Sequence, residues 1–230
     1  MVAPTAFQPT PPVGMAPETW ARLRLGLNVS AVSDILHARG LHKQVMRHDL
    51  QALDPGMRIC GLARTMSSRP RVDAPEPGRE YELLFAAIDG LGAGEVLVTD
   101  AMDCCVWGEL CAEAAMRRGG NGAVIDGFTR DSAEIRALGF PLFCRGRHMS
   151  DLLYHRTIVA LNQPVTCGEV EVRPGDLILG AEDGVLAVPK AHVDDVVREA
   201  YEKSRTESQV RVALRNGMSA GEAYRRFGVM

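Results

Sequence analysis

The feature that most constrains the fold is a glycine-bounded apolar run at residues 122–126, GAVID, which follows a segment of helical periodicity. A short apolar run of this kind is typical of a strand that is buried on both faces of a sheet. The segment before it, residues 107–118, carries apolar residues on one side of a helix and ends at a pair of glycines. These residues therefore predict a helix that returns into a central strand, which is the building unit of an α/β fold.

Helix and strand patterns alternate on both sides of this unit. They predict two more strands and two more helices, at residues 57–66, 96–100, 80–89 and 131–138. The last third differs, because residues 165–189 hold three short β segments separated by turns that contain glycine or proline. A long polar helix is expected at about 191–215, and a short helix opens at Ser219, where Glu222 completes a capping box. The whole pattern predicts an α/β layer that packs on an antiparallel β element.

Three parts are expected along the chain. Residues 1–17 contain five prolines, which exclude a helix interior and predict an extended arm or a tail. A further helical pattern begins at Glu18, and the core is expected to span residues 18–190. Residues 191–230 are expected to form a C-terminal helical extension.

Composition and charge exclude several classes of protein. The 230 residues are 46% hydrophobic and 24% charged, as in ordinary globular proteins. A net charge of −3 implies no basic surface for nucleic acid. No apolar run is long enough for a membrane-spanning helix, and the N-terminus lacks the pattern of a secretory signal. We therefore expect a cytoplasmic protein that binds neither nucleic acid nor membrane, and we expect its six cysteines to be thiols.

Two glycine motifs and one cysteine cluster suggest functions that their context disfavours. Residues 217–221 match the GxSxG pattern of hydrolases, but a helix precedes the serine, whereas a nucleophile elbow follows a strand. Residues 90–94 resemble a dinucleotide loop, but they lead into a strand instead of following one. A metal site on Cys104, Cys105 and Cys111 is disfavoured, because adjacent residues of a strand point to opposite faces.

The residues that predict chemistry lie at the two ends of the helix–strand unit. Gly108 precedes the helix, and the first amide groups of that helix, at Glu109, Leu110 and Cys111, lack intrahelical partners and can bind a carboxylate. Arg130 and Asp131 follow the strand at 122–126. The helix runs out and the strand runs back over a similar length, so the two sites are expected to meet at one edge of the sheet. An exposed Arg130–Asp131 ion pair, with Asp131 as a helix N-cap, explains these two residues equally well.

The same stretch resembles a known family of enzymes. The matching residues include WGEL at 107–110, RGGNGAVIDG at 118–127, Arg130 and Asp131. Further matches are GLART, PLFCRG, PGD and DGVLAVP, at residues 61–65, 141–146, 174–176 and 183–189. They resemble the metal-dependent pyruvate aldolases that act on 4-hydroxy-4-methyl-2-oxoglutarate and 4-carboxy-4-hydroxy-2-oxoadipate. That family shares its fold with the regulator of ribonuclease E activity (RraA-like superfamily), so the resemblance implies a layered α/β/β sandwich, phosphohistidine-domain-like, with a C-terminal helical extension.

The resemblance also implies roles for individual residues. Asp131 matches the carboxylate that binds a divalent metal, Mg²⁺ or Mn²⁺, and Arg130 matches the residue that contacts the pyruvyl oxygens. Gly108 and the amides of Leu110 and Cys111 match the segment that holds the pyruvyl carboxylate, and Glu109 matches an acidic residue that holds metal-bound water. A glutamate from the C-terminal helix of a neighbouring subunit completes the site in the family. Glu207 is the expected counterpart, with Glu202 as the alternative, in a homotrimer or a dimer of trimers.

These roles imply a retro-aldol lyase that cleaves a 4-hydroxy-2-oxo acid to pyruvate, with oxaloacetate decarboxylation as a side activity. The alternative aldolase chemistry, a Schiff base on a buried lysine, is disfavoured because the chain has only three lysines and all have polar neighbours. The second hypothesis is a non-catalytic protein of the same fold that modulates an RNA-degrading enzyme. The resemblance implies that such regulators lack the C-terminal extension that this chain has at residues 191–230, and this favours the enzyme.

Three arginines are unranked candidates for binding a distal substrate carboxylate: Arg64, Arg145 and Arg147.

Overall fold

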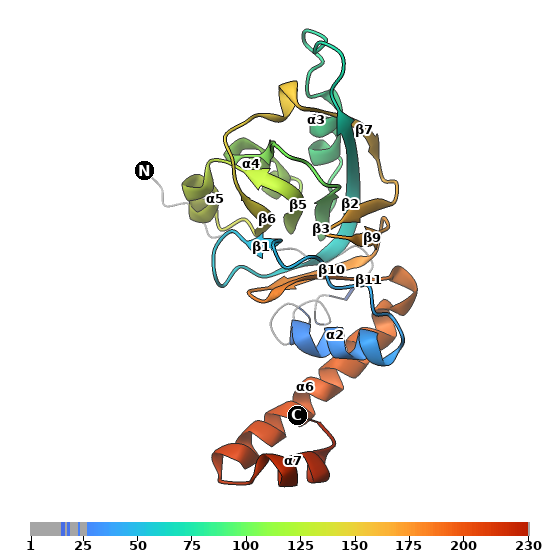
Figure 1. Cartoon of the computed structure of the whole chain (residues 1–230), viewed down its shortest axis with the longest axis vertical. Coiled ribbons are helices and arrows are strands. Elements are labelled where there is room, and N and C mark those ends of the chain that lie inside the picture. Colours follow the sequence, from blue (N-terminus) through green and yellow to red (C-terminus); the bar gives the residue numbers. More distant parts are fainter. Residues whose placement is uncertain (1–14, 17, 19–22, 24–26, 230) are drawn as a thin grey trace.

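One mixed sheet of nine strands forms the centre of the molecule in the computed structural model, which describes residues 15–16, 18, 23 and 27–229 (Figure 1). The order of the main path is β1-β6-β5-β3-β2-β10-β11, with β4 added beside β5 and β7 beside β2. The strands are β1 (Gln51–Ala52), β2 (Ile59–Pro70), β3 (Glu95–Thr99), β4 (Cys105–Trp107), β5 (Gly122–Thr129), β6 (Leu142–Arg147), β7 (Arg156–Leu161), β10 (Leu177–Ala181) and β11 (Gly184–Val188). A separate hairpin contains β8 (Val165–Cys167) and β9 (Val170–Val172).

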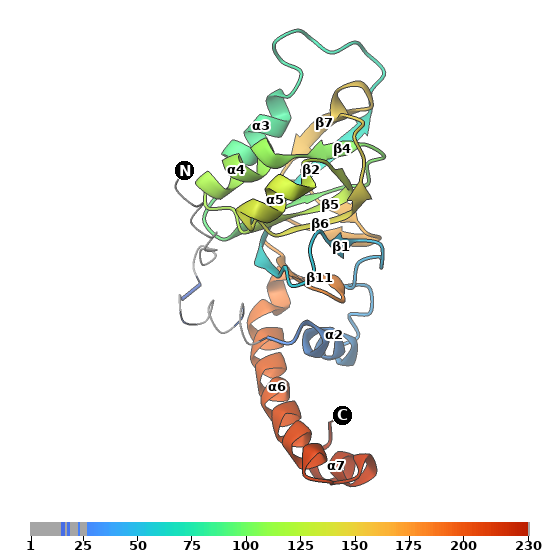
Figure 2. The ribbon, with the colours of Figure 1, turned by 90° about the vertical axis from the view of Figure 1, so that its left-hand side faces the viewer.

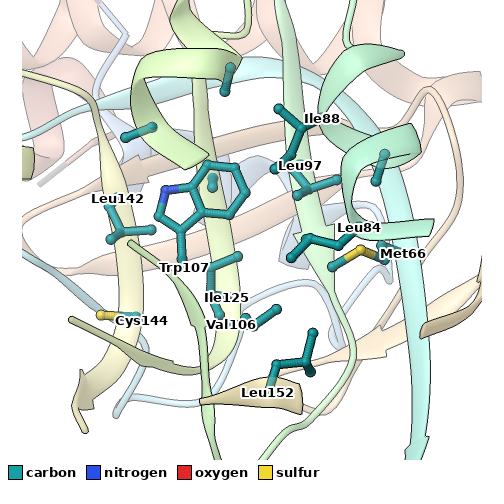
Figure 3. Close-up of a cluster of buried hydrophobic side chains, with 14 of the residues drawn as sticks. Met66, Leu84, Ile88, Leu97, Val106, Trp107, Ile125, Leu142, Cys144 and Leu152 are labelled. Carbon is teal, nitrogen blue, oxygen red and sulfur yellow. The ribbon is translucent and has the colours of Figure 1, made fainter. Parts of the chain in front are cut away.

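The parallel strands β2, β3, β5 and β6 carry helices on one face, as the alternating pattern predicted. These helices are α3 (Glu82–Asp89), α4 (Glu109–Arg117) and α5 (Ser132–Leu138), which follow one another across the sheet (Figure 2). Beneath them lies an apolar cluster in which the indole of Trp107 is fully buried and stacks on Phe140, with a centroid distance of 5.8 Å. Figure 3 shows Val106 and Leu152 in the same cluster. The end of β4 is therefore anchored in the core just before Gly108.

The antiparallel element packs on the other side and curls the sheet into a nearly closed barrel. β10 pairs with both β2 and β11, while β1 pairs with β6 at the far end of the path. A bridge between Val45 and Leu186 links the segment before β1 to β11. The last third holds four β segments between residues 165 and 188 instead of the expected three. The predicted fold class, a layered α/β fold with C-terminal helices, is confirmed.

Strand β5 is longer than predicted, and the difference shapes the site. The strand was predicted over residues 122–126, but β5 continues to Thr129 with a register shift between Ile125 and Phe128. A Cβ atom at Gly127 would lie 3.0 Å from the Met102 carbonyl oxygen, so glycine permits this close passage of the two chain segments. The extension lets Thr129 pair with Trp107 of β4, which places Arg130 and Asp131 beside the start of α4.

The C-terminal helices leave the core on the side opposite α4 (Figures 1 and 2). Helix α6 (Val193–Arg215) packs on α2 (Val29–Ala38), where Arg39 donates to Glu199 at 2.6 Å. Helix α7 (Ala220–Phe227) begins with the predicted capping box of Ser219 and Glu222, so the GxSxG match has a structural explanation. The helix expected from Glu18 and the arm at residues 1–17 lie largely outside the described residues. In the described part of the chain, no helix is long and apolar enough to span a bilayer.

Candidate active site

The end of β4 and the end of β5 are joined by hydrogen bonds to one carbonyl group. The amide of Arg130 donates to the Trp107 oxygen at 3.1 Å, and the Thr129 hydroxyl donates to the same oxygen at 2.8 Å. Thr129 is fully buried, so this junction is shielded from water. The predicted meeting of residues 108–111 with residues 130–131 is therefore found in the structure.

Asp131 has a strained backbone that turns its side chain toward α4. Its φ of 54° and ψ of 39° are left-handed, a conformation that aspartate tolerates better than most residues do. Asp131 stands at the N-cap position of α5, but its side chain makes no capping bond there. Instead, its Oδ2 accepts a hydrogen bond from the Glu109 amide at 3.2 Å. The side chain therefore contacts the start of α4, and the predicted N-cap is found in position only: Asp131 begins α5, but its carboxylate does not cap that helix.

Gly108 makes room for this carboxylate. A Cβ atom at residue 108 would lie 2.6 Å from Asp131 Oδ2, closer than such contacts are found in proteins. The backbone of Gly108 is extended, with φ −137° and ψ −175°, so any residue could adopt its conformation. The need for glycine is therefore steric, and the group that uses the space is Asp131.

Replacing Gly108 with alanine should displace the Asp131 carboxylate and lower any activity that depends on this carboxylate by about 10–100-fold, because small displacements of reacting groups are costly. We expect a fall in Tm of about 2–4 °C, as for about 1 kcal/mol in a chain of this size. Gly221→Ala on α7 is the matched control, since its added Cβ meets only the flexible end of Arg225, at 3.4 Å. Activity near the parent level in Gly108→Ala would show that the position of Asp131 is unimportant.

Arg130 is held mainly by a carboxylate that the sequence did not indicate. Its Nη2 lies 3.1 Å from Asp151 Oδ2, whereas its Nε lies 3.9 Å from Asp131 Oδ2. Asp151 in turn accepts a hydrogen bond from the Tyr81 hydroxyl at 2.8 Å. The expected alternative, a simple Arg130–Asp131 surface pair, does not describe this arrangement. No local pattern marks Tyr81 or Asp151, because tertiary contacts alone bring them to Arg130.

These side chains line a cavity of about 240 Å³. Its polar lining side chains are those of Tyr81, Arg130, Asp131 and Asp151, and the start of α4 lines it at Gly108, Leu110 and Cys111. Its apolar lining includes Leu84, Phe85, Val106 and Leu152. The structure records no acceptor for the amides of Leu110 and Cys111 among the described residues, as expected for the first turn of a helix. The cavity therefore offers amide donors and a guanidinium to an anionic ligand.

The cysteines near the cavity are poorly suited to act as nucleophiles or metal ligands. Burial raises the pKa of the Cys105 thiol to about 11, and burial also raises the pKa of Cys111. Both therefore stay protonated near neutral pH. All six cysteines, which lie in the described part of the chain, carry thiols.

The oxygen donors at Asp131 suit a hard divalent cation. The side chain of Asp131 is 44% exposed, and only its Oδ2 has a recorded hydrogen bond, to the Glu109 amide. Mg²⁺ commonly binds through one or two carboxylates and keeps several waters. No three His, Cys, Asp or Glu side chains among the described residues converge as a metal cage. An ion at Asp131 would thus rely on water for most of its ligands; Glu109 contacts Asp131 through its amide, and it is not among the residues that line the cavity.

Glu207 lies on α6, on the other side of the barrel from α4 (Figure 1). Within its own chain it accepts a hydrogen bond from Asn28 Nδ2 at 3.4 Å and lies 3.9 Å from Lys203 Nζ. Glu202 of the same helix is exposed. The expected contribution of either glutamate to the site of a neighbouring subunit stays a prediction.

The three candidate arginines for a distal carboxylate do not line the cavity. The Nε of Arg145 lies 3.3 Å from the buried Asp126, and Arg64 pairs with Glu95 at 3.5 Å. Arg147 is exposed at the end of β6. Of the described residues that line the cavity, Arg130 is the one with a cationic side chain.

Comparisons with known proteins identify relatives of the chain. A family model described as RraA-like, Aldolase/RraA, matches residues 29–187. A protein of Halalkalibacterium halodurans named "Putative 4-hydroxy-4-methyl-2-oxoglutarate aldolase" is 36% identical over 178 residues, which cover 76% of this chain and 80% of that protein. Protein DlpA of Legionella pneumophila is 30% identical over 203 residues, 86% of this chain, but the match spans only 32% of DlpA.

A solved structure shows the same fold. Streptomyces coelicolor RraAS2, described as an unusual member of the RNase ES inhibitor RraA protein family, superposes with a TM-score of 0.73. Its sequence is 28% identical, and the match covers 86% of this chain and 97% of that chain.

Proposed function

The chain belongs to the RraA-like family of aldolases and RraA proteins, and from this premise we propose that it is a divalent-metal-dependent lyase that cleaves a 4-hydroxy-2-oxo acid to pyruvate. The observation that carries the proposal is the convergence of Arg130, Asp131 and the first turn of α4 on one cavity. The names of aldolase relatives supply the reaction class, and the geometry supplies groups that fit it.

The first step is the placement of the pyruvyl end. The amides of Leu110 and Cys111 donate to the substrate carboxylate, as helix N-termini commonly do for anions. Arg130 donates to the 2-oxo oxygen, where negative charge grows during the reaction. A divalent ion at Asp131 would act as a Lewis acid that polarises the same oxygens.

Cleavage breaks the bond between C3 and C4. The proton of the 4-hydroxyl passes to a water that Glu109 holds, and C4 becomes a carbonyl as its oxygen forms the double bond. The bonding electron pair moves to C3, which gives the pyruvate enolate, and a proton then returns to C3. Oxaloacetate decarboxylation yields the same enolate, so we propose it as a second reaction of this site. Arg130 serves both reactions because both place charge on the same oxygen.

The neighbouring subunit is part of the proposal. We propose that Glu207, or Glu202, of an adjacent copy completes the site in a homotrimer or a dimer of trimers. The small 2-oxo acid is the proposed partner molecule. The cytoplasm is the proposed location.

Removal of divalent ions should abolish activity. In a coupled assay with lactate dehydrogenase, EDTA should stop pyruvate release from 4-hydroxy-4-methyl-2-oxoglutarate and from oxaloacetate, and Mg²⁺ or Mn²⁺ should restore it. Added pyruvate in the presence of EDTA controls for the coupling enzyme, and Mg²⁺ without protein controls for spontaneous decarboxylation. Pyruvate release that is indifferent to EDTA would exclude the metal-dependent mechanism.

A second candidate function follows from the likeness to RraAS2, which is described as belonging to an inhibitor family of an RNA-degrading enzyme. A chain with that role would bind and modulate such an enzyme without turning over a 2-oxo acid. The same assay separates the two functions, because a purely regulatory protein releases no pyruvate at any metal concentration.

A further inference from the structure

Asp151 lies at the centre of a row of polar contacts, two hydrogen bonds and an ion pair, that ends at Arg130. One of its oxygens, Oδ2, lies 3.1 Å from Arg130 Nη2. The other, Oδ1, accepts from the Tyr81 hydroxyl at 2.8 Å and from the Leu153 amide at 2.8 Å. Both oxygens of Asp151 are therefore engaged, which leaves the carboxylate one orientation.

The backbone and the neighbours of Asp151 are held as firmly as its side chain. Asp151 forms a parallel bridge with Cys105, and the Cys105 amide donates to the Ser150 oxygen at 2.7 Å. It also caps the short helical turn Leu152–Tyr154, whose Leu152 is buried in the core (Figure 3). Strand β4 thus anchors both Asp151, through Cys105, and the start of α4, which follows the buried Trp107 by two residues.

Tyr81 can act only as a donor to this carboxylate at working pH. Burial, followed by the hydrogen bond to Asp151, raises the pKa of Tyr81 to about 12. The hydroxyl therefore stays protonated and keeps donating to Asp151 Oδ1.

Arg130 needs such support. Its side chain is long and 44% exposed, and its Nε is 3.9 Å from Asp131 Oδ2, too far for a hydrogen bond. A guanidinium has five N–H donors, so a contact from Nη2 to Asp151 leaves others for a ligand. A group fixed in advance stabilises developing charge without reorganising during the reaction.

We propose that Asp151, supported by Tyr81, is the positioning residue that aims Arg130 at the 2-oxo oxygen of the substrate. The inference rests on the proposed function. Asp151 is not the base of the reaction, because both of its oxygens are already engaged with Arg130, Tyr81 and the Leu153 amide.

Asp151→Asn isolates the contact with Arg130. Asparagine can still cap the turn and accept from Tyr81 through its oxygen, but it presents an amide to Arg130 in place of Oδ2. Loss of orientation should lower kcat on the order of 10-fold. The variant also removes a negative charge beside an anionic substrate, so KM should stay the same or decrease. If Asp151 only stabilised the fold, the Asp151→Asn variant would instead show a lower Tm.

Tyr81→Phe tests the support of Asp151 separately. It keeps the carboxylate and its charge, so kcat should fall by about fivefold or less, because the lost hydrogen bond acts on Arg130 only through Asp151, with KM unchanged. Asp103→Asn is the matched control, because Asp103 is 94% exposed, pairs with Arg145 at 3.3 Å and does not line the cavity.

The orientation of Arg130 can be measured without enzymatic turnover. Phenylglyoxal labels accessible arginines, and peptide mass spectrometry reports the labelling rate of each one. Arg130 should react several-fold faster in Asp151→Asn than in the parent, and somewhat faster in Tyr81→Phe, whereas Arg117, which is 80% exposed, serves as the internal reference.

The two readouts separate the two proposals. An unchanged labelling rate of Arg130 in Asp151→Asn, or a kcat equal to that of the parent, would overturn the positioning role. A higher kcat/KM in Asp151→Asn would also overturn it, by showing that Asp151 competes with the substrate for Arg130. Absence of pyruvate release by the parent protein would overturn the proposed function, and the labelling result would still decide whether Asp151 orients Arg130.

Discussion

Arg130→Ala is expected to lower kcat for pyruvate release by about 10²-fold or more, because removing one preorganised donor to a developing oxyanion costs that much in other enzymes. Arg130 is the cationic side chain that the described residues bring to the cavity, so no other such cation can replace it. KM should change less than kcat, since the amides of Leu110 and Cys111 still hold the substrate carboxylate.

The control for this variant is Arg117→Ala. Arg117 lies near the end of α4, pairs with Glu113 at 3.1 Å and is 80% exposed, so its loss should leave kcat within about twofold, as for most surface ion pairs. A decrease of only a few fold in Arg130→Ala would mean that the guanidinium belongs to a surface ion pair with Asp151.

Asp131→Asn should remove both activity and divalent-ion binding. Asparagine has nearly the same shape and tolerates the left-handed backbone at φ 54°, so the fold should keep its Tm within about 2–4 °C. Its amide oxygen can still accept from the Glu109 amide, but the charge that attracts a cation is gone. We expect kcat to fall by about 10²-fold or more and Mn²⁺ affinity to fall by a similar factor, as for loss of a principal charged ligand.

Isothermal titration with Mn²⁺ and the coupled pyruvate assay measure these two effects independently. Asp89→Asn is the matched control, because Asp89 is an exposed aspartate at the end of α3 that pairs with Arg118 at 2.8 Å. Unchanged Mn²⁺ affinity in Asp131→Asn would remove Asp131 from the metal site. Lost activity with unchanged affinity would assign Asp131 a role in holding the α4 amides instead.

Much of the fold was predictable because its signals are local. The buried strand at residues 122–126, the helices around it and the capping box at Ser219 are each defined by neighbouring residues. The site was predictable in part for a similar reason: a helix and the strand that follows it return to the same edge of a sheet. Gly108, Arg130 and Asp131 were therefore expected together, and the structure brings them together.

The rest of the fold and of the candidate site depended on contacts between segments that are distant in sequence. The extension of β5 past Gly127 depends on β4, which pairs with Thr129. The direction of the Asp131 side chain depends on the space that Gly108 leaves, 23 residues earlier in the chain, and on the Glu109 amide, which donates to Asp131 Oδ2.

The sequence by itself determined the α/β class, the helix and strand that converge on the site, and the residues Gly108, Arg130 and Asp131, because periodicity, caps and turns act over a few neighbouring residues. Only the tertiary structure decided that the Asp131 side chain faces α4 instead of capping α5, that Asp151 pairs with Arg130, and that Tyr81 donates to Asp151. The physical reason is that a carboxylate or a hydroxyl can pair with any donor or acceptor that folding brings within about 3 Å, and the partner is selected by packing, which no local pattern encodes.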